Sequence, residues 1–303
     1  YRKKIPTSLI ISLNLMPLVR LVWHKLYGAW NVACMEYKKL IRSTKMIILA
    51  MFLIFVNIQI ITPLKQCAID MDAKLSYFEP FIAAGNSGMV LLILPLFYLT
   101  MMADYPQEDE STRFYRIRCT KVMWVGGELI FASMSAVSFA IFSVVSTAIL
   151  IIPKGQWIFH FSDATTKYLS VYPDRTGDAV VQLLPINLYN QVTLPVAVRE
   201  TLLLLVLYFF LLALVLLLSS LFGHKGIGII MDGFLVVGGT ILCAARSQIQ
   251  WLFPMAHTIP WLHYSEYYRK QVFPIIGSYL YFVAIDIILI LLCLTVGVKH
   301  RKV

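Results

Sequence analysis

Residues Thr201–Phe222 read TLLLLVLYFFLLALVLLLSSLF, a run without a single charged side chain. An α-helix rises about 1.5 Å per residue, so a run of this length crosses the roughly 30 Å hydrocarbon core of a bilayer. A helix that is apolar on every side needs lipid or a large protein core around it. The stretch therefore predicts a transmembrane helix.

Apolar runs of similar length recur along the rest of the chain. Overall, 59% of the residues are apolar and 14% are charged, against about 25% charged in soluble proteins. No polar stretch is long enough to form a separate soluble domain. We predict an all-α integral membrane protein whose transmembrane domain, 46–303, holds six spans, over residues 46–63, 81–103, 122–152, 201–222, 226–245 and 273–298.

The basic residues orient these spans. With the amino terminus in the cytoplasm, seventeen of the 26 Lys and Arg residues fall in cytoplasmic segments, as the excess of basic residues in cytoplasmic loops requires. An even number of spans then returns the carboxyl terminus to the same side. We therefore interpret the net charge of +10 as serving contact with a membrane surface. No nucleic-acid partner is expected.

Residues 1–45 precede the first span and carry a helical pattern. One broad face is apolar, with Leu18, Val22, Leu26, Trp30, Ala33, Tyr37, Leu40 and Ile41, and the opposite face holds Arg20, His24, Asn31, Lys38 and Arg42. Such a helix lies in the headgroup plane, and the alternative is a helix that packs on a soluble partner. Arg20, His24, Lys38 and Arg42 are its candidate contact residues. The run Ile5–Leu18 lacks a small-residue cleavage site and is expected to lie on or dip into the membrane.

Catalytic signatures are missing from the sequence. It has no HExxH, GxSxG or phosphate-binding loop, so we expect no enzymatic activity, metal or cofactor in this chain. His257 and His263 stand six residues apart among aromatic residues and prolines, and are interpreted as interfacial side chains. The segment 246–272 around them, interrupted by Pro254 and Pro260, predicts short re-entrant or surface helices.

Three acidic residues fall inside predicted spans: Glu128, Asp232 and Asp286. A central acid costs roughly 2.5–3.5 kcal/mol on insertion scales, so it faces protein or water. A proton or substrate path would explain these acids. So would interhelical hydrogen bonds or, for Glu128 and Asp232, positions near a wet cytoplasmic interface.

The loop after the second span begins with acids and ends with bases. That order suits a short helix from about Ser111, because negative charge is favoured at a helix amino end and positive charge at its carboxyl end. The residues concerned are Ser111, Thr112, Arg113, Phe114, Tyr115, Arg116 and Arg118. A docking helix for a soluble partner and a solvated loop that turns the chain around are both consistent with this composition.

This order of features resembles the permease subunits of ABC exporters of the "ABC two" type. The resemblance is carried by Ala103-Asp104-Tyr105-Pro106 followed by Ser111-Thr112-Arg113 and Arg116, by Trp124–Glu128, and by Leu252-Phe253-Pro254-Met255-Ala256-His257. It implies a coupling helix over Ser111–Arg118, separate ATPase subunits that bind ATP and Mg, and a second permease copy or a related chain. A bacterial plasma (cytoplasmic) membrane is the implied location.

Two other functions compete with the exporter permease. A proton-driven secondary transporter would use Asp286 or Glu128, although such transporters usually show internal repeats and broken helices, and no repeat is evident. A non-transport membrane scaffold or enzyme is the third alternative. An enzyme would present convergent polar groups in the spans, where the sequence shows three isolated acids.

Overall fold

The computed structural model describes residues 7–107, 109–265 and 271–299. Its long helices are α1 Thr7–Arg42, α2 Thr44–Asp70, α4 Gly88–Met101, α6 Lys121–Ile151, α11 Leu194–Leu221, α12 Lys225–Ala244 and α14 Ile275–Lys299. The shorter ones are α3 Glu79–Asn86, α5 Glu110–Arg118, α7 Asp163–Thr166, α8 Tyr168–Val171, α9 Ala179–Leu183, α10 Ile186–Tyr189, α13 Pro254–His257 and the 3-10 turns η1 Ile152–Lys154, η2 Gln248–Leu252 and η3 Pro260–His263. Two strands of two residues each, β1 Leu75–Ser76 and β2 Gly155–Gln156, pair in parallel with Leu75 opposite Gly155.

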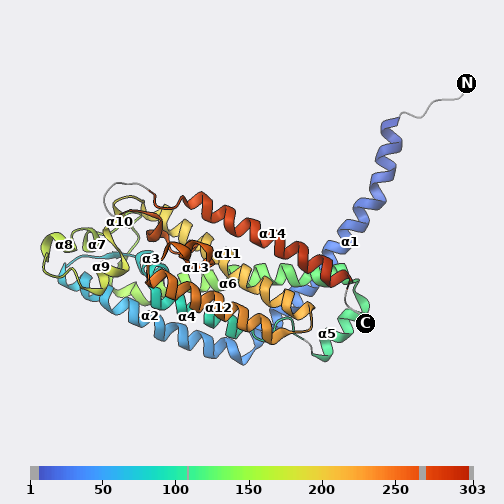
Figure 1. The fold of residues 1–303 in the computed structure, drawn as a ribbon, viewed down its shortest axis with the longest axis horizontal. Coiled ribbons are helices and arrows are strands. Elements are labelled where there is room, and N and C mark those ends of the chain that lie inside the picture. The colour runs from blue at the N-terminus through green and yellow to red at the C-terminus, as the bar shows by residue number, and fades with distance from the viewer. Residues whose placement is uncertain (1–6, 108, 266–270, 300–303) are drawn as a thin grey trace, which may run out of the picture.

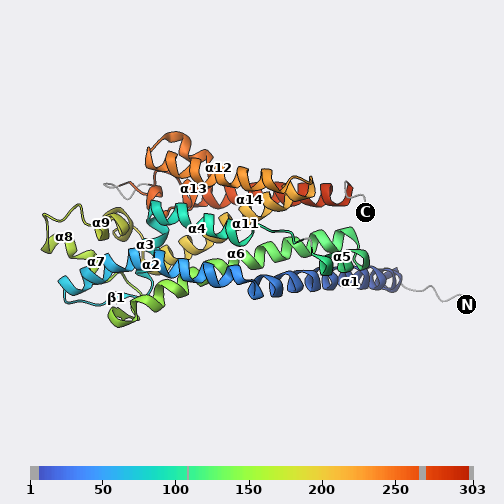
Figure 2. The ribbon, with the colours of Figure 1, turned by 90° about the horizontal axis from the view of Figure 1, so that it is seen from below.

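The helices α2, α4, α6, α11, α12 and α14 run along the long axis of the molecule (Figure 1). At one end lie α5 and the carboxyl end of α14, and α1 extends outward from there. The short helices α7–α10 lie at the opposite end, and Figure 2 shows the same separation in a perpendicular view. We refer to these as the α5 end and the α7–α10 end.

Four helices among the described residues are long and apolar enough to cross a membrane: Lys121–Lys154, Leu194–Leu221, Lys225–Ala244 and Ile275–Lys299. A fifth is added if α3 and α4 count as one span. The prediction of an all-α protein with several helices long and apolar enough to span a membrane is thus confirmed. The first predicted span, 46–63, falls within α2, which is not among these four helices. Six membrane crossings and cytoplasmic termini therefore stay predictions.

The second predicted span is wrong as a single helix. Residues 81–103 form α3 and α4, which meet at an angle of 89°. Ser87 between them is extended, with ψ of 117°, and its Oγ accepts a hydrogen bond from the Val90 amide. Ser, Asn and Gly favour caps and turns over helix interiors, and Gly85-Asn86-Ser87-Gly88 places four of them in a row. The 14 residues of α4 reach only about 21 Å, short of a bilayer core.

The remaining boundaries follow the predictions closely, with two exceptions. The first predicted span ends at residue 63, whereas α2 continues to Asp70. The fourth predicted span begins at residue 201, whereas α11 begins at Leu194. Pro195 stands in its first turn, a position where the missing N–H is not needed by the helix. Arg199 and Glu200 then continue the helix beyond the apolar run. The segment 246–272 holds the short helical turns η2, α13 and η3, as predicted.

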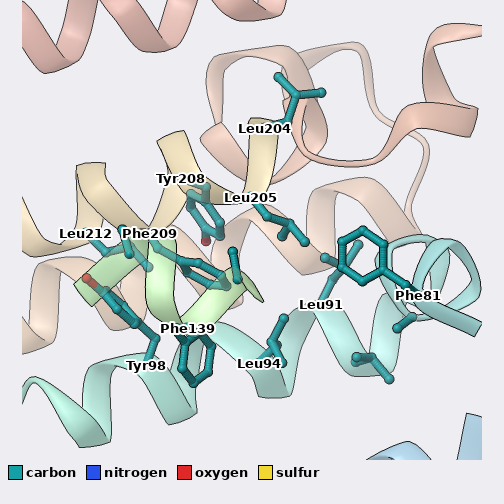
Figure 3. Packing of buried hydrophobic residues seen from close by; sticks show 14 of the residues in the cluster. Phe81, Leu91, Leu94, Tyr98, Phe139, Leu204, Leu205, Tyr208, Phe209 and Leu212 are labelled. Atoms are coloured by element: carbon teal, nitrogen blue, oxygen red, sulfur yellow. The ribbon is translucent and has the colours of Figure 1, made fainter. Parts of the chain in front are cut away.

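The core of the bundle forms around α11. In the most apolar 18-residue stretch of this helix, 67% of the residues are buried. Phe209 of α11 packs its ring 5.0 Å from that of Tyr98 in α4 and 5.0 Å from that of Phe139 in α6 (Figure 3). Aromatic pairs at these distances contribute about 0.5–1.5 kcal/mol beyond the area that they bury. The Tyr98 hydroxyl is within 2.8 Å of Ser135 Oγ, so its polar end is also satisfied.

Helix α1 packs along the first turns of α6 through small side chains. Its buried face is Ala29, Val32, Ala33, Glu36 and Leu40. The predicted apolar face is therefore only partly the buried one, since Leu26, Trp30 and Ile41 are exposed. The reason is steric. Gly127 of α6 lets the α1 backbone approach closely, and a Cβ at that position would lie 2.6 Å from Val32 Cβ and 2.8 Å from Ala29 O.

Two adjacent glycines provide a matched test of this contact. A Cβ at Gly126 would meet Ala29 Cβ at an ordinary 3.5 Å. We expect Gly127→Ala to destabilise the protein by about 1–3 kcal/mol through overpacking. Gly126→Ala should be neutral or stabilising, by about 0.5–1 kcal/mol, because alanine favours the helix. Thermal unfolding in detergent measures both, and equal melting temperatures for the two variants would contradict this account of α1.

Candidate functional site

Helix α5 is the short helix predicted in the loop after the second span, and it begins at Glu110 rather than Ser111. Its first turn is acidic and its last turn holds Arg116 and Arg118, which suits the helix dipole. Phe114 and Ile117 lie three residues apart on one face and are 69% and 80% exposed. The side chains of Ser111, Arg113 and Tyr115 lie outside the described residues.

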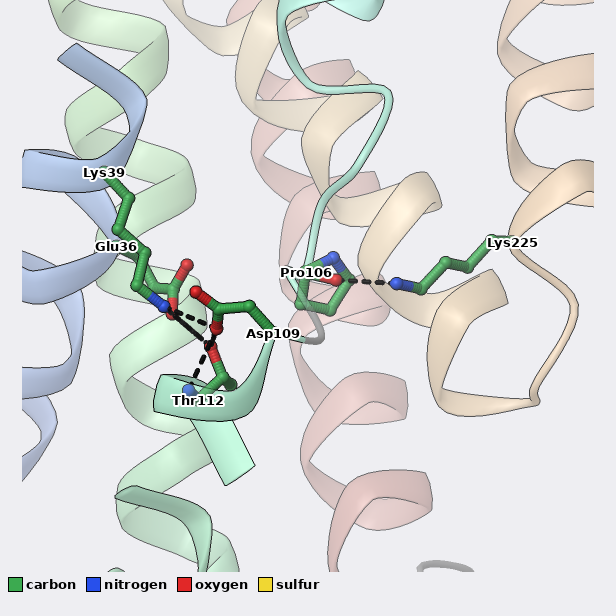
Figure 4. A network of polar contacts seen from close by, with 6 residues as sticks. All are labelled: Glu36, Lys39, Pro106, Asp109, Thr112 and Lys225. Carbon is green, nitrogen blue, oxygen red and sulfur yellow. Dashed lines mark hydrogen bonds and ion pairs between the residues drawn. The ribbon is translucent and has the colours of Figure 1, made fainter. Parts of the chain in front are cut away.

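Lys39 of α1 joins α5 to the rest of the molecule. Its Nζ is 2.8 Å from Asp109 Oδ1, 2.8 Å from Thr112 Oγ1 and 3.4 Å from Glu36 Oε1 (Figure 4). Asp109 also accepts a hydrogen bond from the Thr112 amide at 2.9 Å and so caps the first turn of α5. One ammonium group therefore holds both the cap of α5 and the end of α1.

Burial makes this network costly to break. Glu36 is 1% exposed and Thr112 is 1% exposed. Burial raises the pKa of the Glu36 carboxyl above its ordinary value, while the charge of Lys39 and hydrogen bonds from Lys39 and Thr112 oppose that rise. Removing one partner of a buried pair leaves the other desolvated and uncompensated. The network thus fixes α5 against α1 more firmly than a surface ion pair would.

The segment between α4 and α5 is tied to three further helices. Asp104 pairs with Lys45 in the first turn of α2. Pro106 O accepts a hydrogen bond at 2.7 Å from Lys225, the first residue of α12 (Figure 4). The buried Tyr105 donates its hydroxyl to Glu128 O of α6 at 2.9 Å. A displacement of this segment would therefore be felt by α2, α6 and α12.

The last turn of α5 has its own contact with α6. The Arg116 guanidinium lies 5.0 Å from the ring centroid of Trp124, a buried residue in the first turn of α6. A cation over an indole face contributes about 0.5–2 kcal/mol. Arg116 is therefore held, whereas Arg118 is exposed and available to a partner.

The predicted contact residues of α1 lie elsewhere. His24, Lys38 and Arg42 are exposed and Arg20 has its side chain outside the described residues. Sequence reasoning missed Glu36 and Lys39, which make the contact with α5. Glu36 and Lys39 stand three residues apart on one helix face, and the segment before α5 is rich in acids. Together these two features are the signal that would have indicated a contact between α1 and α5.

The three intramembrane acids lie on three helices and are not joined by hydrogen bonds. Glu128 of α6 and Asp232 of α12 are 0% exposed, and Asp286 of α14 is 4% exposed. None of their carboxylate oxygens has a hydrogen-bond partner among the described residues. No interhelical hydrogen bond to these acids is therefore found among the described residues, whereas the proton path and the wet interface stay predictions. Glu128 stands within electrostatic reach of Arg116, Lys39 and Lys225, at the α5 end.

The two histidines predicted to be interfacial are instead buried together. His257 Nδ1 and His263 Nε2 each lie 2.8 Å from the hydroxyl of Ser278 in α14. Their other ring nitrogens lie 2.9 Å from Trp251 O and 3.0 Å from Ile259 O. Burial lowers the pKa of His257 and lowers that of His263 to about 4. These contacts hold the linker between α12 and α14 onto α14.

No group of three His, Cys, Asp or Glu side chains within the described ranges could hold a metal ion. Comparison of the chain with protein-family models, with curated proteins and with solved structures found no match. The geometry of the chain itself is therefore the basis for any functional proposal.

Two neighbouring lysines test the network around α5. Lys39→Met removes the ammonium group from the network and leaves the buried Glu36 with only the 3.3 Å hydrogen bond from Thr112 Oγ1, and we expect a loss of about 1–3 kcal/mol in stability. Hydrogen exchange of the α5 amides should rise at the same time. Lys38→Met, at an exposed position, should change neither. Unchanged α5 exchange in Lys39→Met would show that the network does not hold α5.

The histidine pair predicts a pH dependence of stability. The folded pKa of His263, about 4, lies below its ordinary value of 6.5, so the unfolded chain binds a proton first as the pH falls. The contribution of His263 is complete above pH 6.5 and is lost as the pH falls toward 4. We expect the melting temperature in detergent to fall more steeply over this range in the wild type than in His263→Gln. His160→Gln, at an exposed position, should keep the wild-type slope, and a wild-type slope in His263→Gln would contradict the assignment.

Proposed function

We propose that this chain is the permease subunit of an ATP-driven exporter, coupled to separate ATPase subunits. The observation that carries the proposal is the placement of α5. It is clamped to α1 through Lys39 and linked to α2, α6 and α12 through the segment before it. It nevertheless presents Phe114 and Ile117 to its surroundings. A helix that is fixed to the bundle and exposes an apolar ridge suits docking.

The partner would be an ATPase subunit that binds ATP and Mg. Its contact surface would need an apolar groove for Phe114 and Ile117, with acidic groups near Arg118. Apolar anchors surrounded by charged residues are the usual arrangement of a docking contact. ATP binding would favour one arrangement of the ATPase pair, and the difference in binding energy between two arrangements is what moves the permease.

A second permease, either a copy of this chain or a related one, would complete the translocation path. The six lengthwise helices, with the short α4 completed by α3 as one broken span, would then be six membrane spans. Both termini and α5 would lie on the cytoplasmic side of a bacterial plasma membrane. Trp23, Leu26, Tyr27 and Trp30 of α1 are at least half exposed. Aromatic side chains of this kind settle in a headgroup layer, which supports an interfacial position for α1.

The buried acids favour a second candidate, a proton-driven transporter. Asp286 is 4% exposed near the middle of α14 and is without a hydrogen-bond partner among the described residues. An isolated buried acid in a spanning helix is expensive and is often part of an ion path. The break between α3 and α4 is also a feature of such transporters. The ATPase requirement distinguishes the two candidates.

The first experiment is purification of the tagged chain in mild detergent from its native host. We expect an ATPase polypeptide to co-purify and ATP hydrolysis to accompany it. Ile117→Asp combined with Arg118→Glu should release that polypeptide, because the exposed ridge would then carry unfavourable charge. Phe159→Asp, at a position that is 68% exposed and lies four residues before α7, should retain it.

Purification of a folded chain alone, with no hydrolysis, would remove the central requirement of the exporter proposal. Transport by reconstituted protein would then be compared for the wild type and Asp286→Asn. Loss of proton-driven transport in that variant would favour the second candidate. If the α5 variant keeps the ATPase and Phe159→Asp releases it, the ATPase docks at the α7–α10 end. That outcome would contradict docking through α5.

A further inference from the structure

The break between α3 and α4 opens a cavity toward the α7–α10 end. Its volume is about 860 Å³, within the range of ligand sites in proteins. One wall is the start of α4, another is α2, and the rest comes from the segment around α9 and α10 and from Arg246 and Trp261. The cavity exists because α3 turns away from α4 at Ser87 by 89°.

The first residues of α4 supply unused hydrogen-bond donors to this cavity. Gly88 and Met89 line it, and their backbone N–H groups bond to no other described residue, whereas Val90 and Leu91 bond to Ser87. The amino end of a helix attracts negative charge through such N–H groups. A Cβ added at Gly88 would meet nothing within 4 Å, so a ligand also has open access to this backbone.

The side chains of the lining extend the same preference. Arg246 is the one charged residue among the described lining residues, which include no acid. Asn86, which is 5% exposed, keeps an unpartnered Oδ1, and Gln59, Gln182 and Asn187 add further amides. A basic group with helix N–H donors binds an anion, while amide oxygens accept hydrogen bonds from hydroxyl groups.

The remaining wall is apolar, with Ile60, Val90 and Ile93 as examples. A free anion such as inorganic phosphate would leave this wall without a partner. A ligand that joins an anionic, hydroxyl-bearing head to a hydrocarbon chain matches both parts of the cavity. Burial of such a chain contributes about 0.8 kcal/mol per methylene group.

We propose that this cavity is a binding site for the headgroup and upper chain of an anionic lipid-like molecule whose head carries a phosphate and hydroxyl groups. The phosphate would lie between Arg246 and the N–H groups of Gly88 and Met89. The ligand would be either a resident membrane lipid or the exported molecule itself. Only its role as cargo rests on the proposed function, since binding requires this chain alone.

The test uses the full chain purified in detergent without any ATPase, titrated with short-chain phosphatidylglycerol and followed by native mass spectrometry. Phosphatidylcholine of the same chain length is the comparison lipid. We expect phosphatidylglycerol to bind at least tenfold more tightly. Gly88→Leu, whose Cβ meets nothing within 4 Å and whose side chain adds volume at the cavity, should weaken binding tenfold or more. Arg246→Asn should do the same, and asparagine suits the positive φ of 49° at that position.

The matched control is Gly226→Leu. A Cβ at Gly226 also meets nothing within 4 Å, but this residue begins α12 near the α5 end, so phosphatidylglycerol binding should stay as in the wild type. Equal affinity for the two lipids, or wild-type affinity in both cavity variants, would overturn the proposal. Equal loss in Gly226→Leu would show a general effect of added bulk and would overturn it as well.

Proteoliposomes that contain the chain and its ATPase distinguish the two sources of the ligand. ATP-dependent movement of fluorescent phosphatidylglycerol between leaflets, abolished by Gly88→Leu, would identify cargo. Tight binding without such movement would identify a resident lipid. Failure to find any ATPase would leave the binding result standing, so the two proposals fail separately.

Discussion

The structure depends on covering α11. This helix is apolar around its circumference, and it lies between α6, α12 and α14, with α3 and α4 also in contact. A helix with no polar face has no preferred side for solvent, so its neighbours take their positions from the shape of its side chains. The tilted and edge-to-face contacts among the rings of Tyr98, Phe139 and Phe209 show how α4 and α6 are fixed in that way. In the most apolar 18-residue stretch of both α12 and α14, only 22% of the residues are buried. The outer faces of these two helices are therefore free to meet lipid.

Charged side chains pair across elements at both ends of the bundle, as Arg175 does with Asp70 of α2 near the α7–α10 end. At the α5 end, charged side chains pair across elements, as Lys39 does with Asp109 and Lys45 with Asp104. At the α7–α10 end, neutral hydrogen bonds dominate the contacts of the α12–α14 linker, as with His257 and Ser278. The pairs Lys39–Asp109 and Lys45–Asp104 are partly exposed, so each contributes at most about 1 kcal/mol. The buried hydrogen bond from Thr112 to Glu36 adds to the attachment of α5.

The sequence was sufficient for features that depend on local composition. Apolar length predicted α6, α12 and α14 to within two residues, and charge order predicted α5. It failed where the outcome depends on tertiary contacts. The break at Ser87 is encoded by weak helix formers inside an apolar run, and a hydropathy average conceals them. The face that α1 buries against α6 depends on the close approach at Gly127 of that helix, so the periodicity of α1 alone could not indicate it. The role of Lys39 was not predicted because its partners in the α5 segment are distant in the sequence. Asp109 is 70 positions away and Thr112 is 73 positions away.

Helix α4 connects the two proposed sites. Its first residues line the cavity, and its last residue, Met101, leads into the segment that Lys45, Lys225 and Lys39 hold. The helix is short, with Pro95 in its interior, and a shift at its carboxyl end would reach its amino end if α4 moves as a unit, as packed helices often do. The break at Ser87 separates this motion from α3, which keeps its own buried contacts. Under the proposed function, an ATPase acting on α5 would therefore change the cavity at Gly88 through α4, and a filled cavity would resist that change. Linkage requires the effect to be reciprocal: lipid in the cavity must alter the affinity of the permease for its ATPase by the same factor as the ATPase alters the affinity for lipid.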